Sequence, residues 1–328
     1  MHLHIAILDL DIPVPTVHAA RGLYSSQFTH LLASAAARLS QSLDKGREIT
    51  ISTSSYDIIG GIFPPSHLLL PHPSQPSDSE TDRIRKIDAI LLTGSSASVY
   101  RPHHHPWIPP LQSFLADVYA NYPHIKLFGS CFGHQVLAQA LVPGCVVEAC
   151  PGGYEMGIGA IALSREFLGR FGLSSPMLGE AGATAGATAG GEGKEMRLQL
   201  IHGDWVVVQG ERGLRLRLPD GWVNVGSTPR CPVQGVYRPG RVLTLQGHFE
   251  FDVFVNRETC LEFGRRGGWD AEVVEGYLRA IEAGDGEDDS EVAAEMVVWF
   301  FAGEDMKVHA DGDVKMEMEG GLLTPPLE

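Results

Sequence analysis

Hydrophobic residues in the first half of the chain alternate between short apolar runs and longer amphipathic segments. The short runs have no helical period and predict buried strands, with one more polar strand between them. Predicted strands cover residues 3–10, 49–55, 87–93 and 125–130. Predicted helices, with apolar side chains at helical spacing, cover residues 18–43, 109–121 and 133–141. This alternation predicts an α/β fold with a mostly parallel central sheet and helices on both faces.

The pattern changes from residue 146 onward, where short strands follow one another without intervening helices. These strands are predicted at residues 157–163, 197–201, 205–208, 222–227, 233–237 and 242–247. Helical segments are predicted at residues 251–265, 270–283 and 289–302. We therefore expect one domain over residues 1–302, in which a small antiparallel strand addition joins the parallel sheet.

Three segments are poor in core-forming residues. Residues 64–82 are rich in Pro and Ser, and residues 174–195 contain the repeat GATAGATAG. Both are predicted to be flexible insertions. Residues 303–328 are rich in Asp, Glu, Met and Gly, and we expect them to form an acidic disordered tail.

Composition narrows the class of protein. The chain has 328 residues, of which 44% are hydrophobic, enough for a sizeable core. Of the net charge of −15, residues 262–328 carry −13, and no basic stripe indicates binding to nucleic acid. No run reaches the roughly 18 apolar residues of a membrane span.

The cysteine content favours a reducing compartment. Five cysteines form an odd set without paired spacing, and the N-terminal sequence MHLHIAILDLDI lacks the layout of a secretory signal. We therefore expect a cytoplasmic protein, in which one well-placed cysteine can act as a nucleophile.

The segment with the clearest chemistry is Gly129-Ser-Cys131-Phe-Gly133, which follows a predicted strand and precedes a predicted helix. This strand–turn–helix context is that of a nucleophile elbow, in which small residues two before and two after the nucleophile avoid collision. At a helix N-terminus, Cys131 would be favoured as a thiolate, and the N–H of Phe132 would face a developing oxyanion. The alternative, an ordinary buried cysteine beside a tight turn, remains open on this segment alone.

A second candidate motif is His248-x-Glu250, at the end of the predicted strand 242–247. A cysteine nucleophile needs a base, and the base needs a third group that fixes its tautomer. Because side chains at i and i+2 of a strand point the same way, Glu250 can orient His248 while the other ring nitrogen faces Cys131. The His-x-Glu pair by itself is also common on protein surfaces.

Other candidate ligand groups have simpler explanations. Three adjacent histidines, 103–105, cannot all face one ion, and no Cys, Asp or Glu lies beside them, so we interpret them as a loop. Cys145 and Cys150 lack two further zinc ligands and are interpreted as packing residues. We therefore expect no metal and no cofactor.

Together, the cysteine elbow and the strand that runs into Gly247-His-Phe-Glu250 resemble the class I glutamine amidotransferase family over roughly residues 3–265. The resemblance is nearest to its stand-alone branch, which includes plant γ-glutamyl peptidases. Phe249 stands where the family usually has proline. Further matching segments are Gly22-Leu-Tyr24 with Phe28, Leu92-Thr-Gly94-Ser95, Pro106-Trp-Ile108, His134-Gln135, His202-Gly203-Asp204, Gly226-Ser-Thr228 and Cys231-Pro-Val-Gln234.

The resemblance implies an activity and a set of roles. Cys131, His248 and Glu250 would form a catalytic triad that cleaves a γ-glutamyl amide through a glutamyl thioester. The N–H groups of Gly94 and Phe132 would form the oxyanion hole. The residues implied in binding the glutamyl part of the substrate are Gln135, His202, Gly203 and Asp204.

Three functions stay open on the sequence. The chain can be an independent hydrolase of γ-glutamyl amides or peptides, with a small-molecule substrate and no nucleic acid or membrane partner. It can be a glutaminase subunit that delivers ammonia to a separate synthase partner. It can also be a non-catalytic binding module, which the presence of all three triad residues disfavours.

Overall fold

The computed structural model describes residues 1–43, 48–71, 86–171, 194–210, 213–215, 217–283 and 288–303. Its centre is a seven-stranded sheet in the order β10-β12-β13-β4-β3-β1-β2. The strands are β1 (His2–Asp9), β2 (Thr50–Asp57), β3 (Ala89–Leu92), β4 (Lys126–Ser130), β10 (Val223–Asn224), β12 (Val236–Arg238) and β13 (Val242–Leu245). The five from β2 to β13 are parallel, and β12 and β10 continue the sheet antiparallel.

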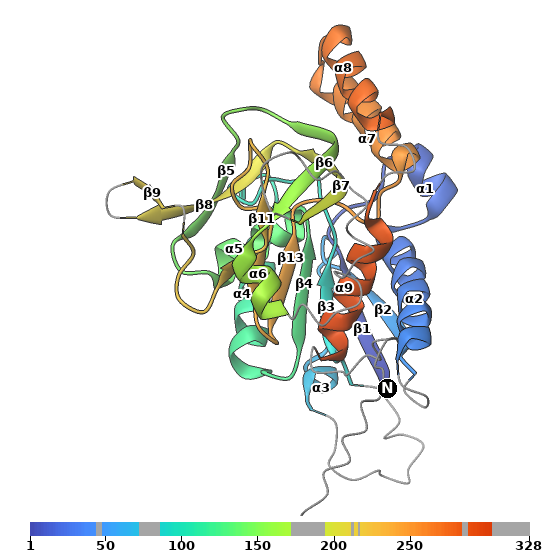
Figure 1. The fold of residues 1–328 in the computed structure, drawn as a ribbon, viewed down its shortest axis with the longest axis vertical. Helices are drawn as coiled ribbons and strands as arrows, with labels where there is room; N and C mark the ends of the chain where they lie inside the picture. Colours follow the sequence, from blue (N-terminus) through green and yellow to red (C-terminus); the bar gives the residue numbers. More distant parts are fainter. Residues whose placement is uncertain are drawn as a thin grey trace, which may run out of the picture.

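Helices cover both faces of this sheet (Figure 1). On one face lie α2 (Tyr24–Ser42) and α9 (Ser290–Ala302), and on the other lie α4 (Ile108–Asn121) and α5 (Phe132–Leu141). Strand β1 shows why both faces are apolar: Ile5 and Ile7 join the core beneath α2, while Ala6 and Leu8 join the core beneath α4. The predicted fold class is confirmed.

Two small antiparallel sheets complete the β-structure. One contains β6 (Glu155–Leu163), β7 (Glu195–His202) and β11 (Gly226–Ser227), and the other contains β5 (Cys145–Ala149), β8 (Asp204–Gly210) and β9 (Gly213–Arg215). These sheets bring the turn between β7 and β8 towards the carboxyl ends of the parallel strands (Figure 1).

The remaining helices lie at the edges. Helices α7 (Val253–Gly267) and α8 (Ala271–Glu282) form a hairpin that extends from one end of the sheet (Figure 1). The shorter helices are α1 (Pro15–Arg21), α3 (Ser66–Leu69) and α6 (Arg165–Phe171). None of the helices that the structure describes combines the length and the apolar composition needed to cross a membrane.

Several predicted boundaries are wrong. The single helix predicted at residues 18–43 is two helices, because Gly22 has a φ of 73° and ends α1. The single strand predicted at residues 222–227 is divided between β10 and β11, which belong to different sheets. Strands β5 and β9 and helices α3 and α6 fall outside the predicted strand and helix ranges.

The predicted insertions are only partly described. Residues 64–82 contain α3, whose Leu69 is buried, so the start of this segment packs against the core. Residues 72–85, 172–193 and 304–328 lie outside the described residues, and with them most of both predicted insertions and nearly all of the predicted tail.

Candidate active site

Cys131 lies at the sharp turn between β4 and α5, with φ 49° and ψ −104°. It is the one non-glycine residue with positive φ in the part of the chain that the structure describes. The neighbouring glycines permit this turn. A Cβ atom at Gly129 would lie 2.4 Å from the carbonyl group of Gly133, and one at Gly133 would lie 2.6 Å from the carbonyl oxygen of Leu92. The local sequence thus forces a strained backbone that presents the thiol.

His248 and Glu250 follow β13 and are both buried. Nδ1 of His248 lies 2.8 Å from Oε1 of Glu250, and the hydroxyl of Ser130 donates to the same oxygen at 2.9 Å. The imidazole ring stacks on Phe251 with 4.1 Å between centroids. Glu250 therefore fixes Nδ1 of the ring, which leaves Nε2 for another partner.

The reason for this alignment differs from the one inferred from the sequence. Strand β13 ends at Leu245, so strand alternation does not place His248 and Glu250 on one side. Instead, the backbone N–H of His248 donates to the carbonyl of Gln199 in β7 at 2.8 Å. Phe249, in place of the family's proline, is buried with its ring against Phe28, at 5.4 Å between centroids.

Cys131, His248 and Gly94 come together at one cavity of about 40 Å³. A Cβ atom at Gly94 would lie 3.1 Å from Cε1 of His248 and 3.7 Å from Cβ of Cys131, so Gly94 is packed against both. The structure thus brings together the three residues predicted for the triad and one of the two predicted oxyanion donors.

Electrostatics at His248 favour a charged imidazole. Burial by itself lowers the pKa of His248, but the nearby charges of Glu250 and Cys131 outweigh burial and raise it to about 10. A positive charge beside the sulfur is the setting in which proteins activate a cysteine nucleophile.

The two predicted oxyanion donors lie on different turns, Phe132 directly after Cys131 and Gly94 after β3. Phe132 is the first residue of α5, and neither its N–H nor that of Gly94 has a hydrogen-bond partner among the described residues. The turn after Gly94 is held by Asp11, whose carboxylate accepts hydrogen bonds from the N–H and hydroxyl of Ser96, both at 2.7 Å. Asp11 was not predicted from the sequence.

Gln246 is a second residue that sequence reasoning missed. It is fully buried, and its side-chain nitrogen donates to Sγ of Cys131 at 3.3 Å. Gln135 sets this orientation, because its own side-chain nitrogen donates to Oε1 of Gln246 at 3.0 Å and to the carbonyl of Asp204 at 3.2 Å. A polar side chain directly after the apolar strand β13 is the signal that could have identified Gln246.

The residues predicted to bind substrate also meet. His202, Gly203 and Asp204 form the turn between β7 and β8, where Nδ1 of His202 donates to the carbonyl of Asp204 at 3.0 Å. Nε2 of His202 lies 3.0 Å from Oε2 of Glu155. Burial raises the pKa of Glu155, but hydrogen bonds from His202 and Thr228 outweigh burial and lower it. The turn is therefore held by a buried carboxylate and reaches Cys131 through the Gln135–Gln246 contact.

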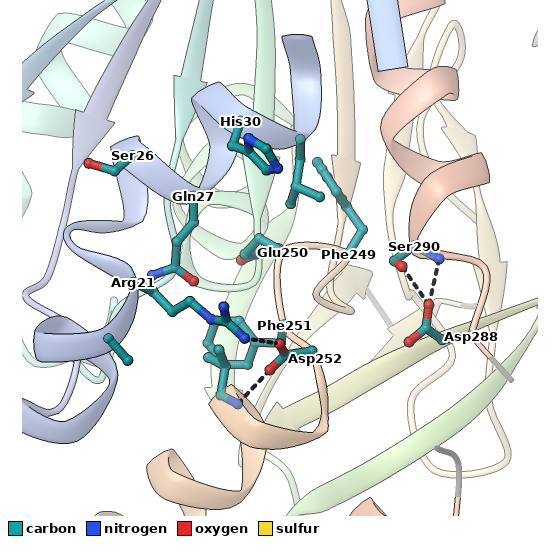
Figure 2. Close-up of a pocket in the computed structure, with 13 residues that line it drawn as sticks. Arg21, Ser26, Gln27, His30, Phe249, Glu250, Phe251, Asp252, Asp288 and Ser290 are labelled. Atoms are coloured by element: carbon teal, nitrogen blue, oxygen red, sulfur yellow. Dashed lines mark hydrogen bonds and ion pairs between the residues drawn. The ribbon is translucent and has the colours of Figure 1, made fainter. Parts of the chain in front are cut away.

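A larger cavity of about 450 Å³ lies behind Glu250, between α2 and the start of α7 (Figure 2). Gln27 of α2 lines it together with Glu250, and the ion pair of Arg21 with Asp252, at 2.8 Å, lies at one end. Cys131 is not among the residues that line this cavity; it lines the smaller cavity next to His248.

Three further cysteines lie buried away from the His248–Glu250 pair. Burial raises the pKa of Cys145 and Cys231 to about 12 and that of Cys260 to about 11, so these side chains are neutral thiols at physiological pH. Among the described residues, no three His, Cys, Asp or Glu side chains are grouped as metal ligands. Residues 102–104 form a turn, as interpreted from the sequence.

A mainly parallel sheet with a cysteine elbow after one strand and a His-x-Glu pair after its neighbour is the architecture of the class I glutamine amidotransferases. The chain is 30% identical over 259 residues to a glutamine amidotransferase-like protein of Schizosaccharomyces pombe, covering 78% of this chain and 82% of that protein. The chain therefore belongs to the glutamine amidotransferase-like family.

A second yeast relative, from Saccharomyces cerevisiae, has a name that places it among the glutamine amidotransferases. It is 32% identical over 176 residues, which cover 53% of this chain and 57% of the relative. No family model matches the chain.

Solved structures agree on the fold. A glutamine amidotransferase from Thermotoga maritima superposes with a TM-score of 0.56 at 14% identity, over 92% of this chain and 99% of that one. A glutamine amidotransferase from Methylobacillus flagellatus gives a TM-score of 0.50 at 16% identity, over 95% of this chain and 98% of that one.

Proposed function

We propose that the protein is a hydrolase that cleaves a γ-glutamyl amide bond, in glutamine or in a γ-glutamyl peptide, with Cys131, His248 and Glu250 as its catalytic triad. The observation that carries the proposal is the meeting of the strained Cys131 turn with the buried His248–Glu250 pair at one cavity. Membership of the glutamine amidotransferase-like family supports it.

The mechanism follows from the positions of these groups. The Cys131 thiolate attacks the γ-carbonyl carbon, and the resulting oxyanion accepts hydrogen bonds from the N–H groups of Gly94 and Phe132, worth about 3 kcal/mol each. His248 gives its proton to the leaving amine as the C–N bond breaks, which leaves a glutamyl thioester. His248 then takes a proton from water as the water attacks the thioester, and glutamate and the thiolate are released.

The turn at His202–Asp204 would hold the glutamyl head, because it is linked to the thiol through Gln135 and Gln246. Gln135 would act mainly by positioning, because its side-chain nitrogen already bonds Gln246 and the carbonyl of Asp204. Glu250 would keep the imidazolium oriented throughout, since it bonds Nδ1 and leaves Nε2 for the reacting groups.

Replacement of the nucleophile tests the proposal. Cys131→Ala should lower glutamate release by at least about 10³-fold, because the residual catalysis comes from binding and the oxyanion hole alone. Mass spectrometry of the wild-type protein, quenched in acid with γ-glutamyl substrate, should detect a glutamyl thioester on Cys131. Cys145→Ala, which removes a buried thiol elsewhere, serves as the control. Full activity of Cys131→Ala would refute the proposal.

A further inference from the structure

The cavity that Cys131 and His248 line lies where the leaving group of the proposed reaction would be. His248 must give its proton to the leaving nitrogen, so the substituent on that nitrogen extends into the cavity that His248 lines. The turn expected to hold the glutamyl head, His202–Asp204, does not line this cavity. We therefore call it the leaving-group cavity; its wall includes Gly94, Cys131, His248 and one face of α7.

Helix α7 contributes Thr259, Phe263 and Arg266 to this wall. Their spacing places all three on one face of the helix. Among the described residues that line the cavity, Arg266 carries the one guanidinium or ammonium group. Asp11 also lines it, but its carboxylate already accepts hydrogen bonds from Ser96 and from the N–H of Ile12 at 2.8 Å.

Arg266 has hydrogen-bond donors that its contact with Glu262 does not use. Arg265 and Arg266 share one carboxylate, that of Glu262, which leaves one positive charge uncompensated within the group. Arg265 uses two hydrogen bonds of 2.7 Å to Glu262, whereas Arg266 bonds it through Nε alone, also at 2.7 Å. The two terminal nitrogens of Arg266 have no hydrogen-bond partner within the described part of the chain.

The size of the cavity sets what can reach Arg266. Its volume of about 40 Å³ holds a few water-sized groups, so it accepts the leaving nitrogen and little more. A larger substituent must extend towards the rim, and Arg266 lies there with 54% of its side chain exposed. A planar guanidinium with free terminal nitrogens is the group best suited to bind a carboxylate through two hydrogen bonds.

We propose that Arg266 selects γ-glutamyl substrates whose leaving amine carries a carboxylate, that is, a γ-glutamyl amino acid or peptide. This inference rests on the proposed function and names the substrate class of the same site. Arg266 is then a specificity-determining residue, while the triad chemistry stays the same for every γ-glutamyl amide.

A pair of matched substrates tests the inference. γ-Glutamylalanine and γ-glutamylalanine amide differ in the carboxylate of the leaving group, and the ratio of their kcat/KM values measures how strongly that carboxylate is selected. We expect the wild-type protein to favour γ-glutamylalanine at least about tenfold, and Arg266→Gln to bring the ratio close to one. Arg265→Gln is the control, because Arg265 bonds the same Glu262 but does not line the cavity. It should keep the wild-type ratio.

The inference is overturned if the wild-type ratio is near one, or if Arg266→Gln and Arg265→Gln change it equally. Failure of the proposed function looks different, because then neither substrate is cleaved in a manner that depends on Cys131. In that case the inference is tested by calorimetry, which measures the binding of both compounds to the Cys131→Ala variant. Tighter binding of γ-glutamylalanine than of its amide, lost when Arg266→Gln is added, supports the inference; equal binding or no binding overturns it.

Discussion

At the scale of single residues, the charge on His248 depends chiefly on one carboxylate. Burial opposes that charge, and Glu250 is the largest of the influences that restore it and raise the pKa to about 10. Protonation of the leaving amine requires the imidazolium, so activity should persist in alkaline solution until the pH approaches this value.

Glu250→Gln removes that charge and keeps the shape of the side chain. We expect kcat/KM for a γ-glutamyl substrate to fall by about 10² to 10⁴-fold at pH 7.5, and the alkaline limit of the pH–rate profile to move to lower pH. Glu148→Gln, in β5, is the control carboxylate. An unchanged alkaline limit in Glu250→Gln would contradict the assigned role.

The same shift has a consequence for stability. Because the pKa of His248 is raised from 6.5 in the folded state, its imidazolium stabilises the fold fully below about pH 6.5. This contribution is lost as the pH rises through about 10. The free energy of unfolding should therefore decline between pH 7 and 10 more steeply in the wild-type protein than in Glu250→Gln.

Gln246 offers a second test at this scale. Its N–H donates to the sulfur of Cys131, and a hydrogen bond to a charged group is worth about 1.5 to 3 kcal/mol. Gln246→Leu should lower the rate of Cys131 alkylation by iodoacetamide at neutral pH by about tenfold or more. Gln139→Leu, on α5, is the matched control, because Gln139 bonds the backbone of Val147 instead. Equal alkylation rates in the two variants would exclude a role for Gln246 at the thiol.

A site residue could be predicted from the sequence where the residues that determine its role are its neighbours in the chain. Cys131 could be predicted because its two glycines and the predicted strand and helix on either side are adjacent to it in the sequence. Asp11 and Glu155 could not, because their partners lie far away in the sequence, and Gln246 was missed although its polar side chain directly follows an apolar strand. Asp11, for example, bonds Ser96, and Glu155 bonds Gln234 at 2.8 Å.

At the scale of elements, the junction of β4 and α5 leaves no room for a side chain at either of its glycines, Gly129 and Gly133. Gly129→Ala would place a methyl group 2.4 Å from the carbonyl group of Gly133, which must then shift. We expect the free energy of unfolding, measured with denaturant, to fall by about 1 to 3 kcal/mol. The thiol of Cys131 should also be displaced. Gly276→Ala, inside α8 with open space around it, should instead stabilise by about 0.5 to 1 kcal/mol. Equal effects would show that the turn is not tightly packed.

The elements themselves were predictable where burial is periodic. Strand β1 could be predicted because its residues alternate between two hydrophobic cores, so that its sequence is a short apolar run. The break between α1 and α2 was missed because apolar residues continue at helical spacing across Gly22, whose positive φ ends the first helix. Residues 222–227 read as one strand, although the chain crosses there from the central sheet to the small sheet of β6 and β7. The point at which the chain passes from one sheet to the other depends on the strands that pair with it, β12 and β6, and the hydrophobic pattern of residues 222–227 does not show these partners.

At the scale of the whole molecule, the site forms where two sheets meet. Leu198 and Met196 of β7 share a hydrophobic core with Ile5 and Phe128 of the central sheet. The same strand accepts the backbone hydrogen bond of His248. The position of the imidazole thus depends on the packing of the small sheet of β6 and β7 against the parallel one.

This packing predicts one cooperative unfolding transition for the protein. Because the two sheets share a core, neither can lose its structure without exposing the apolar surface of the other. The calorimetric enthalpy should equal the van't Hoff enthalpy, and tryptophan fluorescence and Cys131 alkylation should report the same midpoint in guanidinium chloride. A separate, earlier transition seen only by Cys131 alkylation would mean that the small sheet unfolds by itself. The expected single domain over residues 1–302 would then be wrong, and the imidazole would be held by a part of the molecule less stable than the strand that carries the thiol.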